Sequence, residues 1–134
     1  MLILQFYIYN NVSISRGGID MLYTEKRIDH VHERFGGVGD ATIEHYFIES
    51  EINDKINLYA KVTLEPGSSF GYHQHSGTSE TIVILSGTAE VNDNGTLCIL
   101  HAGDVTFCPE GCSHSITNPS DSEPLVVQAL VAKV

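Results

Sequence analysis

The sequence predicts an all-β domain, a small antiparallel β-sandwich or jelly roll, over residues 43–134. Short segments rich in β-branched and aromatic residues follow one another there, and turn-forming residues separate them about every eight to twelve positions. No stretch in this region repeats its apolar residues at helical spacing over about ten residues. These observations favour strands throughout the region and argue against a helical or mixed domain.

The predicted strands follow the chain from residue 42 to its last residue. Asn92 to Gly95, with the sequence NDNG, predict a hairpin turn, because Asn and Gly tolerate the positive φ of a tight turn. Segment 23–35 is the one plausible helical turn in the chain. A further strand carries the pair His73 and His75. The other predicted strands are the segments 42–50, 56–67, 81–87, 87–91, 96–103, 104–111, 113–118 and 124–134.

The length of 134 residues suits one domain with one hydrophobic core. We divide the chain into an N-terminal extension (1–20), an arm (21–42) and the β domain (43–134). We expect natural translation to start at Met21, because residues 16–18 can be encoded by purine-rich codons that resemble a bacterial ribosome-binding site. If the extension belongs to the protein, we expect it to add a strand at a sheet edge.

The charge of the chain excludes several classes of partner. Lys and Arg total 7 against 17 Asp and Glu, which gives a formal net charge of -10. Such a surface repels phosphate backbones and anionic lipids, so we expect neither nucleic acid nor membrane as a partner. The three cysteines match no paired zinc-binding spacing and indicate small, partly buried residues in a reducing compartment. We therefore expect a cytoplasmic protein.

Two histidines and a glutamate stand close together in the stretch 71–80. Residues two apart on a strand point the same way, so His73 and His75 can offer two imidazoles to one metal ion. A short turn with Gly77 brings Glu80 back toward them, and His114 can supply a fourth ligand from another strand. This donor set suits one divalent transition metal, namely Mn, Fe, Ni, Co or Zn. On spacing alone, metal binding and an ordinary pair of histidines are equally acceptable.

A second pair with the same spacing, His30 and His32, has no companion carboxylate at a matching position. We interpret these two histidines as surface or structural residues.

Two longer patterns extend the first histidine pair, fifteen residues apart: Gly67-x5-His73-x-His75-x4-Glu80-x6-Gly87 and Gly103-x5-Pro109-x-Gly111-x2-His114-x3-Asn118. In this order they resemble the two sequence motifs of the cupin superfamily. The resemblance covers about residues 58–130 and implies a six- to eight-stranded jelly roll barrel, a cupin-type double-stranded β-helix. It also implies a single-domain metal-binding member that forms a homodimer through its sheets. The metal ligands that the resemblance implies, all facing the barrel interior, are His73, His75, Glu80 and His114.

The remaining motif residues have structural interpretations. We expect the glycines and Pro109 to shape turns, Asp104 to be a turn residue and Asn118 to end a strand. Phe70 and Gln128 are candidates for the cavity lining. The alternative, with Phe70 in the core and Gln128 exposed, is equally acceptable.

Two functions are compatible with this site. Four protein ligands on an ion that prefers six leave two adjacent positions open, which is typical of a catalytic centre. We favour a metal-dependent enzyme that acts on a small carboxylate or other oxygen-rich substrate by decarboxylase-, dioxygenase- or isomerase-type chemistry. The alternative is a non-catalytic module that binds metal and a small, anionic ligand as a sensor or sequestering protein. We assign no catalytic residue.

Overall fold

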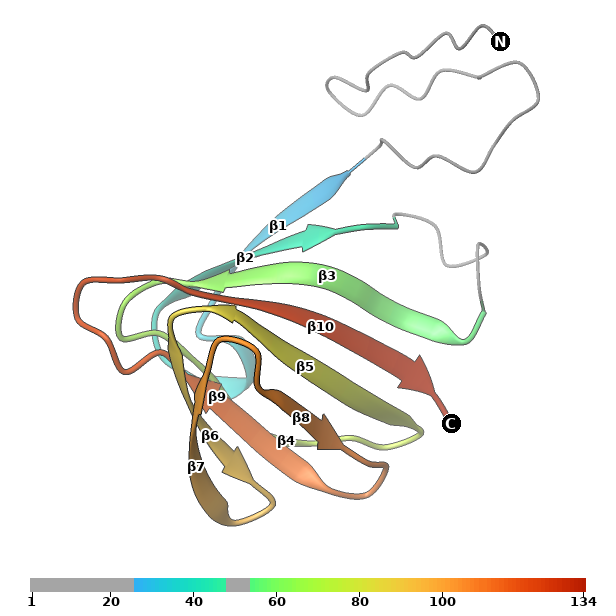
Figure 1. Cartoon of the computed structure of the whole chain (residues 1–134). Helices are drawn as coiled ribbons and strands as arrows, with labels where there is room; N and C mark the ends of the chain where they lie inside the picture. Colours follow the sequence, from blue (N-terminus) through green and yellow to red (C-terminus); the bar gives the residue numbers. More distant parts are fainter. Residues whose placement is uncertain (1–25, 48–53) are drawn as a thin grey trace, which may run out of the picture.

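A computed structural model of the chain describes residues 26–47 and 54–134, and it is built almost entirely from antiparallel strands (Figure 1). The described residues form ten strands and one short 3-10 turn, more strands than the resemblance implied. In chain order they are β1 (Arg27–His32), η1 (Arg34–Gly36), β2 (Asp40–His45), β3 (Ile56–Leu64), β4 (Ser69–Gln74), β5 (Thr78–Ser86), β6 (Thr88–Asp93), β7 (Thr96–His101), β8 (Val105–Cys108), β9 (Ser113–Thr117) and β10 (Leu125–Lys133).

The strands form two facing sheets. The first has six strands in the order β1-β2-β3-β10-β5-β8, and the second has four in the order β4-β9-β6-β7. All pairings in both sheets are antiparallel, which confirms the all-β fold class. Among the described residues no ladder joins the two sheets, so the barrel is not closed and the fold is a jelly-roll sandwich.

The core lies between the sheets because apolar residues alternate along the strands that face each other. On β10, for example, Leu125, Val127 and Ala129 are buried while the residues between them are only half-buried. β3 and β5 show the same alternation, with Leu64 and Ile84 almost fully buried. The inner face of each strand therefore follows from the period of two in its sequence.

The predicted helical turn over residues 23–35 is wrong for the described part of that segment. Residues 27–32 form β1, which pairs with β2, and only the short η1 turn follows. A polar cluster holds β1 in place, since His45 Nε2 on β2 lies 2.9 Å from Asp29 Oδ2 and 3.0 Å from an Arg27 nitrogen. Pairing with a neighbouring strand thus overrides the weak local preference for a helix.

The predicted hairpin at NDNG is confirmed. Asn94 and Gly95, between β6 and β7, have φ of 48° and 103°, the positive values that this tight turn requires. Gly87, between β5 and β6, has φ of 91°, and a Cβ there would meet the Pro124 carbonyl oxygen at 2.7 Å. Glycine at this point therefore lets the chain turn closely past the segment that leads into β10.

The described part of the predicted arm contributes to the six-stranded sheet as β1 and the start of β2. The extension 1–20, with the proposed start at Met21 and the expected edge strand, lies outside the described residues. So does the end of the predicted strand 42–50, beyond residue 47. In the described ranges no helix is long and apolar enough to cross a membrane.

Candidate metal centre

Three strands bring the predicted ligands together at one end of the space between the sheets. β4 and β9 pair with His73 directly opposite His114, and His75 directly follows the last residue of β4. Glu80 lies on β5 and shares its inward face with the buried Ile82. The four side chains that meet are His73, His75, Glu80 and His114, and one potential ligand atom from each lies within 4.8 Å of all the others.

The ligand atoms of the three most enclosed residues nearly touch. His75 Nε2 and His114 Nε2 lie 3.1 Å apart, and Glu80 Oε1 is 3.1 Å from the first and 2.8 Å from the second. His75 and His114 are only 7% and 3% exposed. Neutral imidazole nitrogens and a carboxylate oxygen that point at one another in a buried site are the donors that a divalent transition metal requires.

The Nδ1 atoms of His73 and His75 already have hydrogen-bonding partners, which fixes the orientation of both rings. His73 Nδ1 donates a hydrogen bond to the Gly71 carbonyl oxygen at 2.8 Å, so its Nε2 carries the free lone pair. His75 Nδ1 lies 2.9 Å from Thr78 Oγ1. Such outer partners orient metal-binding histidines, and this observation shows that the residues fit a metal ion. Thr78 was not found from the sequence.

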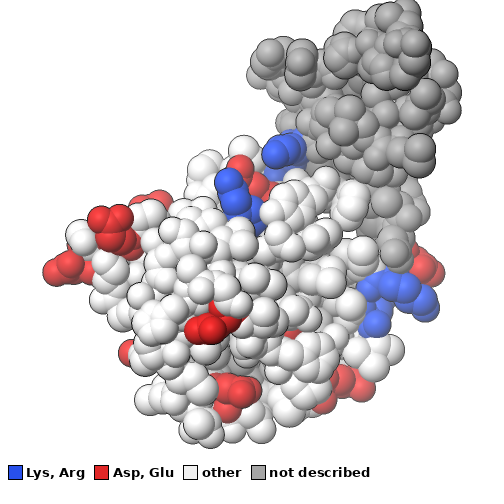
Figure 2. All heavy atoms as spheres, viewed as in Figure 1, with Lys and Arg blue, Asp and Glu red and all other residues white. Residues whose placement is uncertain are grey.

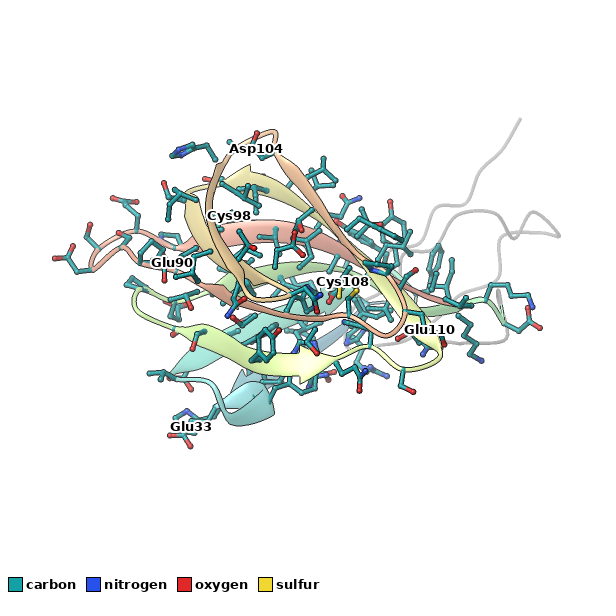
Figure 3. The ribbon with its side chains drawn as sticks, turned by 90° about the horizontal axis from the view of Figure 1, so that it is seen from below. Glu33, Glu90, Cys98, Asp104, Cys108 and Glu110 are labelled. Carbon is teal, nitrogen blue, oxygen red and sulfur yellow. The ribbon has the colours of Figure 1, made fainter. Side chains whose placement is uncertain are left out.

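Backbone contacts hold the two turns beside the site. His75 N donates to the Cys112 carbonyl at 3.0 Å, and Gly111 N donates to the His75 carbonyl at 2.7 Å. The Glu110 carboxylate accepts a hydrogen bond from Gly77 N at 2.8 Å, so its side chain braces the turn that leads to Glu80 (Figure 3). The expectation that Pro109 and Gly111 shape a turn is consistent with these contacts and with the hydrogen bond from Cys112 N to the Pro109 carbonyl.

The electrostatics of the site favour a neutral imidazole at His73. Burial lowers the pKa of His73, because the charged ring would lose its hydration. A neutral ring keeps a lone pair for metal binding at a pH where an exposed histidine is partly protonated. Cys108 lies opposite Glu80 on β8, and burial raises the pKa of its thiol to about 11. This sulfur is therefore a neutral thiol at physiological pH (Figure 3).

A cavity of about 80 Å³ adjoins the four ligand residues. Drug-sized ligands occupy pockets of about 300–1,000 Å³, so this cavity suits a ligand of only a few heavy atoms. Its walls are otherwise mainly apolar. The lining side chains beyond the ligands include Ile43, Leu58, Val62, Leu64, Phe70, Ile82, Ile116, Val127, Ala129 and Val131.

Of the two candidate lining residues, the structure places one in the cavity wall and one outside it. Phe70 lines the cavity while it also packs against the core. The assignment of Gln128 to the cavity is wrong. Its neighbours Val127 and Ala129 point inward, so Gln128 lies on the outer face of β10 and donates to the Tyr59 hydroxyl at 3.0 Å. Alternation along β10 could have revealed this, because adjacent residues on a strand face opposite sides.

The structure adds two residues that sequence reasoning missed. The ring of Phe35, in η1, stacks on the His73 ring with centroids 3.9 Å apart and an angle of 18°. Arg34 lines the same cavity, and its guanidinium carbon lies 4.8 Å from the centre of the Phe35 ring. No signal in the sequence indicates this, because these residues precede the first ligand by almost forty positions and approach it only after folding.

Two other motif residues have the structural roles predicted for them. Asn118 is 1% exposed, and its side-chain nitrogen donates to the backbone carbonyls of Leu64, Glu65 and Glu123. This amide ties the chain just beyond β9 to the end of β3 and to the segment that leads into β10. Asp104 accepts a hydrogen bond from His101 N at 2.8 Å in the turn between β7 and β8, away from the metal centre.

The fold and the four convergent ligand residues define the class of the protein. Residues 60–132 match the family model for the cupin domain, and the chain belongs to the cupin family. It is 37% identical over 100 residues to an oxalate-binding protein from Thermotoga maritima, an alignment that covers 75% of this chain and 80% of the relative.

Solved structures and longer relatives extend the comparison. A crystal structure from Thermotoga maritima, described as a predicted oxalate decarboxylase, has a TM-score of 0.78 and 32% identity, covering 87% of this chain and all of that one. Mannose-1-phosphate guanylyltransferase from Klebsiella pneumoniae is 39% identical over 59 residues, but the match covers only 12% of that protein. The latter likeness therefore concerns a small part of a much longer chain.

Proposed function

We propose that this cupin binds one divalent transition metal per chain and takes a small carboxylate, such as oxalate or a 2-oxo acid, as its ligand. One observation carries the proposal: a partly buried cluster of three histidines and one carboxylate adjoins a cavity too small for a sugar nucleotide. The proposed metal ligands are His73, His75, Glu80 and His114.

The charge and size of the site support an anionic ligand. Three neutral imidazoles and one carboxylate leave a bound divalent ion with a net local charge of about +1. Surface charges are screened beyond roughly 8–10 Å in physiological salt, so the ion dominates inside the cavity despite the acidic chain. Two adjacent open positions suit a bidentate acid. The names of both Thermotoga maritima relatives point to the same ligand class.

We propose turnover of such an acid, by decarboxylase-, dioxygenase- or isomerase-type chemistry, as the activity. A bound metal would supply Lewis-acid polarisation of the carboxylate or carbonyl oxygens. The chain would contribute neutral imidazoles, an apolar cavity that excludes water, and a fixed orientation of the ligand residues.

A specific observation favours the non-catalytic alternative. Among the described residues that line the cavity, Glu80 is the one carboxyl group, and it belongs to the proposed ligand set. No independent general acid therefore faces the cavity from the described chain. A module that binds metal and carboxylate without turnover requires none.

Titration of cobalt-loaded protein tests the ligand class. We expect oxalate and 2-oxo acids to change the visible spectrum at millimolar levels or below, while neutral sugars leave it unchanged. A response to sugars alone would contradict the proposal. Product analysis after incubation with the same acids then separates the enzyme from the binding module, and metal analysis of protein purified without added metal identifies the native ion.

We also propose a cytoplasmic homodimer. The outer face of β5 and β8 exposes Leu85, Val105 and Phe107, at 43%, 58% and 56%. Figure 2 shows wide uncharged areas between separate acidic groups on this side of the molecule. Two copies of so acidic a chain repel each other, so an uncharged face suits their contact. Phe107→Glu should shift the sedimenting species from dimer to monomer, and an unchanged dimer would contradict this face.

A further inference from the structure

The η1 turn is fitted closely against the strand that carries the histidine pair. A Cβ at Gly71 on β4 would collide with the Phe35 carbonyl oxygen, and a Cβ at Gly37 would collide with the Ser69 carbonyl oxygen. The two backbones therefore approach as closely as only glycines allow. Ser69 N donates to the Val38 carbonyl at 2.7 Å and completes the attachment.

This turn has an unfavourable backbone. Glu33 and Phe35 have φ of 48° and 55°, values that side-chain-bearing residues seldom adopt. Left-handed residues other than glycine are strained and are concentrated at binding and active sites. The strain places the Phe35 ring on the His73 ring and brings Arg34 to the cavity.

Arg34 is the one charged side chain, outside the four ligand residues, among the described residues that line the cavity. No carboxylate in the described part of the chain forms an ion pair with it, although the protein is strongly acidic. Glu33, its neighbour, extends away from the strands at the outer end of the turn (Figure 3) and lies 3.4 Å from His32 instead. The guanidinium is left with the Phe35 ring as its contact.

We propose that Arg34 determines specificity by binding the second acid group of a dicarboxylate whose first group is held by the metal. This assignment rests on the proposed function, because it requires a carboxylate on the ion. Arg34 lines the same cavity as the four residues of the cluster, so its guanidinium can meet an acid group that is held there. Guanidinium binds carboxylate through two parallel hydrogen bonds, and an apolar cavity strengthens that interaction.

The proposal distinguishes dicarboxylates from monocarboxylates. Oxalate has one acid group for the metal and one for Arg34, whereas acetate has only the first. Loss of Arg34 should therefore weaken oxalate binding selectively. The Phe35 ring is a positioning residue in this scheme, since it supports the guanidinium and the His73 ring without meeting the acid group.

The test uses full-length, cobalt-loaded protein titrated with oxalate and with acetate, followed by the visible spectrum. Arg34→Gln is compared with Lys61→Gln, which removes the same charge from the outer side of β3, where Lys61 pairs with Glu44 at 3.2 Å. Cobalt content and circular dichroism are measured on each variant. Arg34→Lys keeps the positive charge but lacks the planar guanidinium group, so it tests whether the two parallel hydrogen bonds are required in addition to the charge.

We expect Arg34→Gln to retain cobalt, to bind oxalate about tenfold or more weakly, and to leave acetate binding nearly unchanged. The oxalate affinity of Arg34→Lys should fall between those of Arg34→Gln and the wild type, and the oxalate affinity of Lys61→Gln should match that of the wild type. Equal losses for oxalate and acetate, or equal effects at Arg34 and Lys61, would overturn the assignment while the proposed function stands. Wild-type protein that binds cobalt but neither acid would overturn both.

Discussion

His73 with His75, and His30 with His32, have the same spacing on strands of one chain, yet their surroundings differ. The first pair points between the two sheets, where Glu80 and His114 converge on it. The second pair lies on β1, at the edge of the six-stranded sheet, and both side chains are exposed. His30 has only a long contact of 3.5 Å with Thr42 Oγ1.

His32 of the exposed pair and His73 of the enclosed pair also hold protons differently. Hydrogen bonding to the Asp40 carboxylate, 2.8 Å from Nδ1, raises the pKa of His32, and Glu33 adds to this effect. Burial lowers the pKa of His73. A charged imidazole cannot bind a metal, whereas a neutral one can. Enclosure by a second sheet, rather than the two-residue spacing, therefore separates a ligand pair from a surface pair.

The largest effect expected is the loss of metal from the enclosed pair. His75→Ala and His114→Ala each remove one of four donors, and we expect the affinity for cobalt or zinc to fall by more than about 100-fold, because changes outside the ligand shell already cost 10–100-fold. His32→Ala is the matched control and should retain about one ion per chain. Metal analysis after dialysis measures the metal content of each variant. Normal occupancy in both His75→Ala and His114→Ala would contradict the ligand assignment.

A substitution at Gly71 can separate η1 from β4 and so expose His73 of the enclosed pair. Gly71→Ala places a methyl group against the Phe35 carbonyl, and we expect a loss of about 1–3 kcal/mol in the free energy of unfolding. Oxalate affinity should fall as well, since Phe35 and Arg34 move away from the cavity.

Gly103→Ala provides the control for that change. It strains a turn with positive φ between β7 and β8 but has open space around it. Denaturant unfolding should show that this variant is destabilised while cobalt-loaded protein still binds oxalate like the wild type. A similar loss of oxalate binding in both variants would show that general destabilisation, and not the η1 contact, is responsible.

Metal affinity should depend on pH because protons compete for the imidazoles. We expect binding of cobalt to be constant at pH 7–8 and to weaken below roughly pH 6 to 6.5. The lowered pKa of His73 means that the unfolded chain takes up a proton before the folded chain does. The metal-free protein should therefore also lose stability as the pH falls below 6.5, the ordinary imidazole value. Affinity independent of pH between 5 and 8 would exclude a three-histidine site.

His32 of the exposed pair should change the stability of the protein in the opposite direction with pH, and this effect should be the smallest of those predicted. Because the folded-state pKa of His32 is raised, its contribution to stability is present below the unfolded value of 6.5 and is lost as the pH rises through the folded value. His32→Gln should destabilise the protein slightly at pH 5.5 and leave it unchanged at pH 9. Urea unfolding at the two pH values measures this difference, and a penalty that persists at pH 9 would show that the ion pair is not its cause.

Particular residues show what sequence reasoning could and could not reach. Segments rich in β-branched and aromatic residues, bounded by turn residues, predicted the strands β3, β5 and β10, and the turn chemistry of Asn94 and Gly95 predicted their hairpin. Alternation along β10 places Gln128 on the outer face, which decides between the two alternatives that the sequence left open for this residue. β1 was missed because its stability comes from pairing with β2 and from the contacts of Asp29 with His45.

The sequence by itself determined the strand pattern, the acidic charge and the four residues that could ligate a metal, because these depend on local periodicity and on motif spacing. Only the tertiary structure decided which histidine pair is enclosed, where the barrel stays open, and that Arg34 and Phe35 reach the cavity. Burial and stacking arise when segments distant in the chain pack together. Those contacts shift the pKa values of His32 and His73 and set the size of the cavity, and no local pattern encodes them.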